Sequence, residues 1–139
     1  MDTEPGPGTS LPDTGTDTGS VGIVAENVAK RLQLGIQPDA EPGQGHYFRS
    51  DHFSFARAGI PAFSIDLGTE FEGKPAGYGM RMWEEYNRLH YHHPSDEYHE
   101  NWDFTSDAQA AEFGFILGSD IANQDKLPDW RPGDQFHRQ

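Results

Sequence analysis

Apolar residues at helical spacing predict two long helices in this chain. The first helix carries them every three or four positions, at Val21, Val24, Val28 and Leu32. We expect this helix to be capped by Ser20 and to end at Gly35, which can adopt a left-handed conformation. The second helix is expected from about Thr105 to Asn123, with Asp103 or Thr105 as its cap. Its first turn holds Asp107, and its apolar positions are Ala108, Ala111, Phe115, Ile116 and Ile121.

Between these helices, the pattern predicts a short helix followed by a strand. Ser50 or Asp51 can cap a helix that runs through Ala58 and ends at Gly59. The apolar run Ile60–Ile65 that follows is typical of a buried strand. A helix, a turn and a strand in this order indicate an α/β layer.

The remaining segments are predicted to be irregular. Residues 1–20 consist mainly of Gly, Pro, Thr, Ser and Asp, so we expect them to be disordered and the folded domain to span residues 21–139. Residues 36–45 suit a short extended segment and a loop, because they hold two Pro and two Gly. Residues 68–82 hold four Gly and one Pro without periodicity, which predicts a long loop. The tail after residue 123 is expected to lie extended across the domain, pinned by aromatic side chains at Trp130 and Phe136.

Composition restricts the classes of partner. The 139 residues include 10 Lys and Arg against 23 Asp and Glu, for a formal net charge of -13. A nucleic-acid partner is not expected, because no basic cluster exists to displace counterions from phosphates, and an anionic membrane surface would repel the chain. The sequence contains no bilayer-spanning apolar run and no signal-peptide pattern. It has no Cys, so disulfides and thiolate metal sites are excluded, whereas seven His leave His/Asp/Glu metal chemistry open.

Two clusters carry candidate chemistry. In the first, Arg49 precedes the N-terminus of the predicted short helix, where an anion such as a carboxylate or an oxyanion is favoured. The alternative is that Asp51 only caps this helix and that Arg49 is a solvated surface residue.

The second cluster is rich in histidine. His90, His92, His93 and His99 lie within ten residues, and Asp96 and Glu97 lie among them. A loop imidazole can coordinate zinc while a nearby carboxylate orients it. Neighbouring residues of an extended segment point to opposite sides, so His92 and His93 are not expected to share one metal. Spacing alone leaves open whether these are ligands or surface histidines.

Both clusters resemble a known peptidase signature. The matching stretches are Arg49 to His52, Phe55, Gly59 to Ala62, Tyr91 with His92, and Pro94 to Glu97. In this order they resemble metallopeptidase family twenty-eight of clan MH, over roughly Val21 to the C-terminus. That family includes secreted bacterial aminopeptidases, glutamate carboxypeptidase and, by relationship, the glutaminyl cyclases. The resemblance implies an α/β fold, here the C-terminal part of an α/β/α sandwich, with a pair of zinc ions at the C-terminal strand ends. It also implies an exported protein, periplasmic or secreted, although the chain itself leaves the location unknown.

The resemblance also implies roles for individual residues. His92 takes the place of the family's last zinc ligand, and His93 is then its outward neighbour. Tyr91 matches a tyrosine that donates to the tetrahedral intermediate, and Arg49 matches an arginine that holds the substrate. Asp51 and His52 match a pair near the rim of the site, where they support other residues or cap a helix. The implied reaction is hydrolysis of N-terminal peptide bonds by a metal-activated water.

Most of the family's metal site has no match in this chain. The other ligands and the general-base Glu should come from earlier motifs, yet the first His is His46, and the Glu84–Glu85 pair is in the wrong place. We therefore expect this chain to be the C-terminal portion of a zinc aminopeptidase domain, inactive alone and supplying one clear zinc ligand. A sheet that lacks strands has an open edge, which favours a homo-oligomer or pairing with the missing portion. The alternative is a non-catalytic acidic module whose His-rich loop binds a partner or, weakly, a metal.

Overall fold

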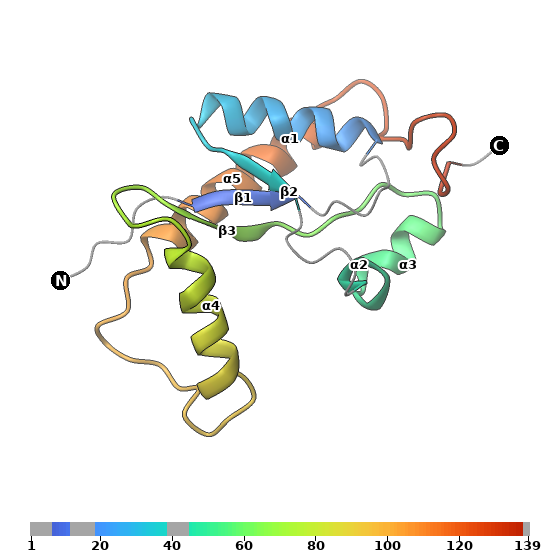
Figure 1. Cartoon of the computed structure of the whole chain (residues 1–139). Coiled ribbons are helices and arrows are strands. Elements are labelled where there is room, and N and C mark those ends of the chain that lie inside the picture. The colour runs from blue at the N-terminus through green and yellow to red at the C-terminus, as the bar shows by residue number, and fades with distance from the viewer. Residues whose placement is uncertain (1–6, 12–18, 39–44, 138–139) are drawn as a thin grey trace.

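The computed structural model describes residues 7–11, 19–38 and 45–137. In these residues three strands form one mixed sheet in the order β2-β1-β3, with β1 parallel to β2 and antiparallel to β3 (Figure 1). The strands are β1 (Pro7–Leu11), β2 (Ile36–Pro38) and β3 (Asp66–Phe71). The helices are α1 (Gly19–Arg31), α2 (His46–Arg49), α3 (His52–Arg57), α4 (Tyr78–Leu89) and α5 (Thr105–Ala122). The α/β class is therefore confirmed, whereas the two-sided sandwich stays a prediction.

The central strand of the sheet comes from the segment that was expected to be disordered. β1 pairs Thr9 with Ile36 on one side and with Leu67 on the other. Expected disorder is therefore wrong for residues 7–11, and also for Gly19 and Ser20, which begin α1; the other residues of that segment lie outside the described part. A central strand is held by backbone hydrogen bonds on both sides, so it can form with few apolar side chains.

Helix α1 confirms the first predicted helix, but its start differs from the prediction. The Ser20 backbone N–H donates to the Asp129 carbonyl at 3.0 Å, and the Ser20 hydroxyl accepts from the Asp129 N–H at 3.0 Å. Ser20 therefore ties the start of α1 to the C-terminal tail instead of capping the helix. Gly19 has a φ of 64°, and a Cβ there would overlap the Asp129 carbonyl. This close approach requires glycine.

The end of α1 is formed by a residue other than the predicted Gly35. Gln33 takes the left-handed conformation, with a φ of 58°. Its N–H donates to the Lys30 carbonyl at 3.2 Å, and the Leu34 N–H donates to the Ala29 carbonyl at 2.9 Å. This pair of bonds is a Schellman motif, and Leu34 packs on the core as the motif's apolar partner.

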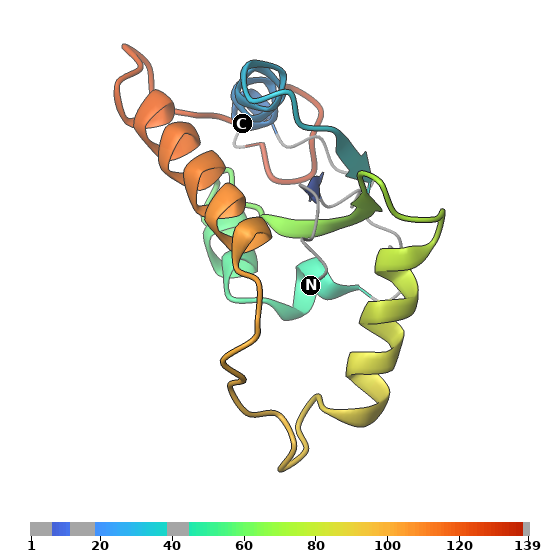
Figure 2. The ribbon, with the colours of Figure 1, turned by 90° about the vertical axis from the view of Figure 1, so that its left-hand side faces the viewer.

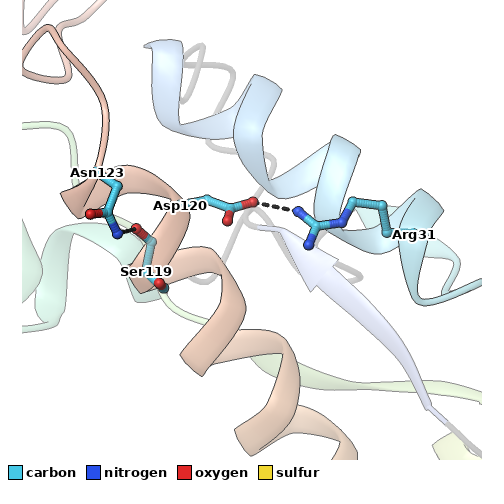
Figure 3. Close-up of polar contacts among 4 residues, drawn as sticks. All are labelled: Arg31, Ser119, Asp120 and Asn123. Carbon is cyan, nitrogen blue, oxygen red and sulfur yellow. Dashed lines mark hydrogen bonds and ion pairs between the residues drawn. The ribbon is translucent and has the colours of Figure 1, made fainter.

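The main core lies between α1 and α5, which lie side by side (Figure 2). α5 also contacts β1 and β3, so it joins the helices to the sheet. At the edge of this contact Arg31 Nη1 lies 2.6 Å from Asp120 Oδ2, and near the end of α5 Asn123 Nδ2 donates to the Ser119 carbonyl at 2.8 Å (Figure 3). The buried residues of this core are Ala25, Val28, Ala29, Phe113 and Leu117.

The predicted strand Ile60–Ile65 is wrong in position. These residues have no strand pairing, and the strand β3 begins at Asp66. Phe63 and Ile65 still pack against the main core, whereas Ile60 is 53% exposed. The apolar run therefore signals burial, while strand pairing occurs where the backbone faces β1.

The predicted loop over residues 68–82 is also wrong, because it contains most of β3 and the start of α4. Gly77 precedes α4 with a φ of 75°. Gly79 lies against the Phe71 ring and the Thr69 carbonyl, where a Cβ would overlap both. The glycines of this segment therefore permit a turn and a close helix-to-strand contact. Beyond that contact, α4 extends away from the sheet (Figure 1).

A second core joins α2 and α3 to the C-terminal tail. Trp130 is buried with Tyr47 and Ala56, and Phe53 and Phe136 pack around them. The predicted pinning of the tail is thus confirmed. The Tyr47 hydroxyl donates to the Ala62 carbonyl at 2.9 Å, which fixes the segment that follows α3.

The ends of the helices follow the predicted caps only in part. Asp51 stands before α3 but makes no side-chain capping bond, whereas Gly59 ends this helix region with a φ of 80°. At the start of α5 the N-cap is Phe104, which makes no side-chain capping bond, so neither predicted cap is correct; Asp103, one residue earlier, accepts from the Thr105 N–H at 2.9 Å. Among the helices that the structure describes, none combines the length and apolar character needed to cross a bilayer.

Candidate functional site

The turn after α4 carries Tyr91 and His92. The N–H groups of His90 and Tyr91 both donate to the Tyr86 carbonyl, at 2.8 and 3.0 Å, and the His93 N–H donates to the His90 carbonyl at 2.8 Å. The rings of Tyr91 and His92 are in contact, with centroids 4.0 Å apart. The structure therefore brings together two of the predicted site residues.

Side chains also hold this turn against the end of α4. The Tyr86 hydroxyl donates to Asp96 Oδ2 at 2.9 Å, and this bond is the main cause of the raised pKa of Tyr86. The Ser95 hydroxyl donates to the Leu89 carbonyl at 3.0 Å and lies 3.1 Å from His90 Nδ1. Because the single Ser95 proton is used, His90 Nδ1 is the donor in that contact. Residues 90–96 thus form a braced turn.

His92 has an unusual backbone conformation. Its φ is 60°, in the left-handed region, and its side chain is exposed. A non-glycine residue there costs about 1–2 kcal/mol, although His tolerates this region better than most residues do. The extended backbone assumed for His92 and His93 is therefore wrong, because the chain is folded into a turn at this point.

The described residues do not form a metal site on their own. Nowhere in residues 7–11, 19–38 and 45–137 do three His, Asp or Glu side chains lie close enough to hold one ion. A catalytic zinc needs three protein ligands. His92 can supply one, so the side chains placed here do not by themselves fit the zinc centre that the resemblance implies.

The first predicted cluster lies on α2 and α3. Arg49 is the last residue of α2, and Asp51 and His52 stand at the start of α3. The ring of His52 packs edge-on against Tyr47, with centroids 4.6 Å apart. Burial lowers the pKa of His52, opposed by the Asp66 and Asp51 carboxylates. His52 therefore favours its neutral form and supports the packing of this region.

The two clusters are not adjacent. α2 and the turn after α4 lie apart in both views (Figures 1 and 2). Tyr91 with His92, and Arg49 with Asp51 and His52, are thus two separate groups in this structure.

Sequence reasoning missed the residues that brace the turn. Tyr86 and Ser95 position Tyr91 and His92; Ser95 was noted only as part of the stretch Pro94 to Glu97, and Tyr86 was not singled out. A signal was present, because Tyr78, Met82, Tyr86 and Leu89 recur at helical spacing. The glycines on either side of Tyr78 masked it.

Comparison with known proteins places the chain in a family. No curated protein and no solved structure matches it. The model of peptidase family M28 matches residues 3–115. This match begins earlier than the resemblance from Val21 onward, and it includes β1, both site clusters and the first part of α5. Because the match covers well over half of the sequence, the chain belongs to peptidase family M28.

Proposed function

We propose that this chain functions as part of a zinc-dependent aminopeptidase, to which it contributes His92 as a metal ligand and Tyr91 as a hydrogen-bond donor. The observation that carries the proposal is the family match, which spans the braced turn after α4. The substrate is a peptide with a free N-terminus, and the reaction is hydrolysis of its first peptide bond.

His92 suits the role of a ligand because of its exposure and its position. A neutral imidazole binds zinc through a ring nitrogen, and this ring stands on a turn held by several hydrogen bonds. The left-handed backbone costs free energy that glycine would avoid. A role for the imidazole explains why histidine occupies this position.

Tyr91 suits the role of a donor to the oxyanion that forms from the substrate carbonyl. Its ring is half-exposed and is flanked by His92 and by Tyr86, whose centroid lies 6.2 Å away. A hydroxyl held in advance where charge develops stabilises the transition state without reorganisation. Arg49 stands on α2, so we propose that it contacts a part of the peptide remote from the bond that is cleaved.

We propose that the remaining ligands come from outside the described residues, because these contain no complete group of ligands. We propose that another part of the peptidase supplies them and also extends the sheet into the sandwich. In the described sheet β2 and β3 are the outer strands, and open edges recruit further strands. Where that other part of the peptidase is absent, we propose that a second copy of this chain covers an open edge of the sheet. We also propose that the protein is exported, either periplasmic or secreted, in keeping with the family resemblance.

Zinc titration of the purified chain tests the ligand assignment. We expect weak binding that His92→Ala abolishes and that the neighbouring His93→Ala retains. His93 is a matched control, because it is an exposed histidine in the same turn. Equal losses in both variants would show that the assignment of His92 is wrong.

Hydrolysis of amino-acid anilides tests the site as a whole. We expect negligible turnover by this chain alone, and activity when a polypeptide with the family's other ligands is added. In that complex Tyr91→Phe should lower kcat more than it changes KM, as for a group that acts in the transition state. Rapid hydrolysis by the chain alone, with stoichiometric tightly bound zinc, would contradict the proposal.

A further inference from the structure

Three aromatic side chains that the peptidase proposal does not use form an exposed cluster between α4 and α5. The rings of Tyr98 and Trp102 have centroids 5.9 Å apart, and those of Trp102 and Phe104 are 6.2 Å apart. Tyr98 and Phe104 are nearly parallel, with an interplanar angle of 14° and centroids 6.4 Å apart. Their exposed fractions are 65% for Tyr98, 46% for Trp102 and 51% for Phe104. We call these three residues the aromatic triad.

The triad is held in place by the backbone around it. The Trp102 N–H donates to the His99 carbonyl at 3.1 Å, and this turn brings Trp102 back beside Tyr98. The Phe104 carbonyl accepts from the Ala108 N–H at 2.9 Å, in the first turn of α5. One side of the triad is therefore attached to the longest helix of the fold.

The segment of sequence that carries the triad is acidic. From residue 89 to residue 125 the sequence contains eight Asp and Glu and no Lys or Arg. Glu97 is next to Tyr98 in the sequence and Glu100 is two residues before Trp102, and both are exposed. Neither of these two carboxylates is ion-paired with another described residue. The triad thus combines negative ring faces with negative side chains.

We propose that the aromatic triad is a binding site for the arginine side chain of a partner peptide. The faces of Trp, Tyr and Phe attract a cation, and Trp does so most strongly. A guanidinium suits such a surface because it is planar, stacks on aromatic rings and is weakly hydrated. The carboxylates of Glu97 and Glu100 add attraction for the same charge. This site is independent of the peptidase function proposed above.

The positive end of α5 lies close to the triad and opposes a cation. That end corresponds to about half a positive charge. Asp103 accepts from the first N–H of α5, and Asp107 lies in the first turn. These two carboxylates outweigh the partial charge, so Glu97 and Glu100 remain to favour the cation.

Nuclear magnetic resonance of the full chain tests the site, with the indole N–H of Trp102 as the probe. The ligand is a blocked Gly-Arg-Gly peptide, and its control has citrulline, which has the same shape but no charge. We expect the arginine peptide to shift the Trp102 signal and the citrulline peptide to leave it in place. A second titration uses tetramethylammonium, a small cation without a peptide. If it shifts the Trp102 signal more strongly than the arginine peptide does, the site binds small cations and the peptide proposal is overturned.

Variants give the proposal a second test. Trp102→Ala should weaken binding about fivefold, the factor for losing one exposed cation–π contact, as read from the peptide's own signals. Trp83→Ala should not, although Trp83 is 49% exposed on α4. Replacing both Glu97 and Glu100 by Gln keeps the rings and should make the remaining binding less sensitive to salt. Equal effects of Trp83→Ala and Trp102→Ala would overturn the proposal. A Trp102 signal that moves with protein concentration alone would overturn it too, because the triad would then be a contact between copies.

Discussion

Replacing Phe113 by Ala tests whether the contact between α1 and α5 holds this fold together. Phe113 is completely buried in the main core, against residues that include Val28 and Leu117. Truncation of a buried Phe to Ala costs about 3–5 kcal/mol, the sum of lost transfer free energy and the cavity left behind. A domain of this kind has an unfolding free energy of about 5–15 kcal/mol. Phe113→Ala should therefore remove a large part of it.

The same helix offers a matched control. Phe115 lies two residues further along α5 and is 77% exposed. Phe115→Ala removes the same atoms but little buried area, and Ala is a better helix former by about half a kcal/mol. We therefore expect its free energy of unfolding to be unchanged or slightly raised.

Urea denaturation followed by circular dichroism measures both variants. With a slope of about 1–3 kcal/mol per molar urea, Phe113→Ala should lower the midpoint by about 1 M or more, whereas Phe115→Ala should leave it in place. Equal shifts in the two variants, or a larger loss for Phe115→Ala, would refute the reasoning. The buried face of α5 would then be a different one from that described.

Two further predictions concern a pair of glycines and a tyrosine. Gly79→Ala should lower the melting temperature although Ala favours helices, because its Cβ would overlap Phe71. At Gly118 no atom lies within 4 Å of the new Cβ, so Gly118→Ala should stabilise the protein by about 1 kcal/mol, measured by thermal unfolding. A fall in melting temperature as large as that of Gly79→Ala would contradict the packing described for Gly118. Burial, with a smaller effect of the Asp134 carboxylate, raises the pKa of Tyr47 to about 12. Its unfolded value is about 10, so its contribution to stability is full below pH 10 and is lost as the pH rises through 12. Urea unfolding across this range should show the decline in the wild type and less of it in Tyr47→Phe; identical profiles would exclude Tyr47 as the cause.

The candidate site could be anticipated in its residues but not in its arrangement. Tyr91 and His92 were singled out together, and the structure places their rings in contact. Arg49 was assigned to the same site, yet α2 lies apart from the turn after α4. Motifs preserve order along the chain, whereas proximity depends on how the segments between them fold. Here the intervening segment contains α4, where the glycines at 77 and 79 led us to predict a loop instead of a helix.

What the sequence determined by itself was local. α1 and α5 follow from the 3.6-residue spacing of apolar positions, and the bond from the Thr105 N–H to Asp103 joins residues only two apart in the sequence. The peptidase family likewise follows from residues in order. Tertiary structure decided the rest, because a strand needs a partner that may be far along the chain. Leu67 lies in a strand through its pairing with Thr9, and position 79 of α4 requires glycine because Phe71 leaves no room for a side chain. Neither fact is encoded in the neighbours of these residues, so only the assembled fold could supply it.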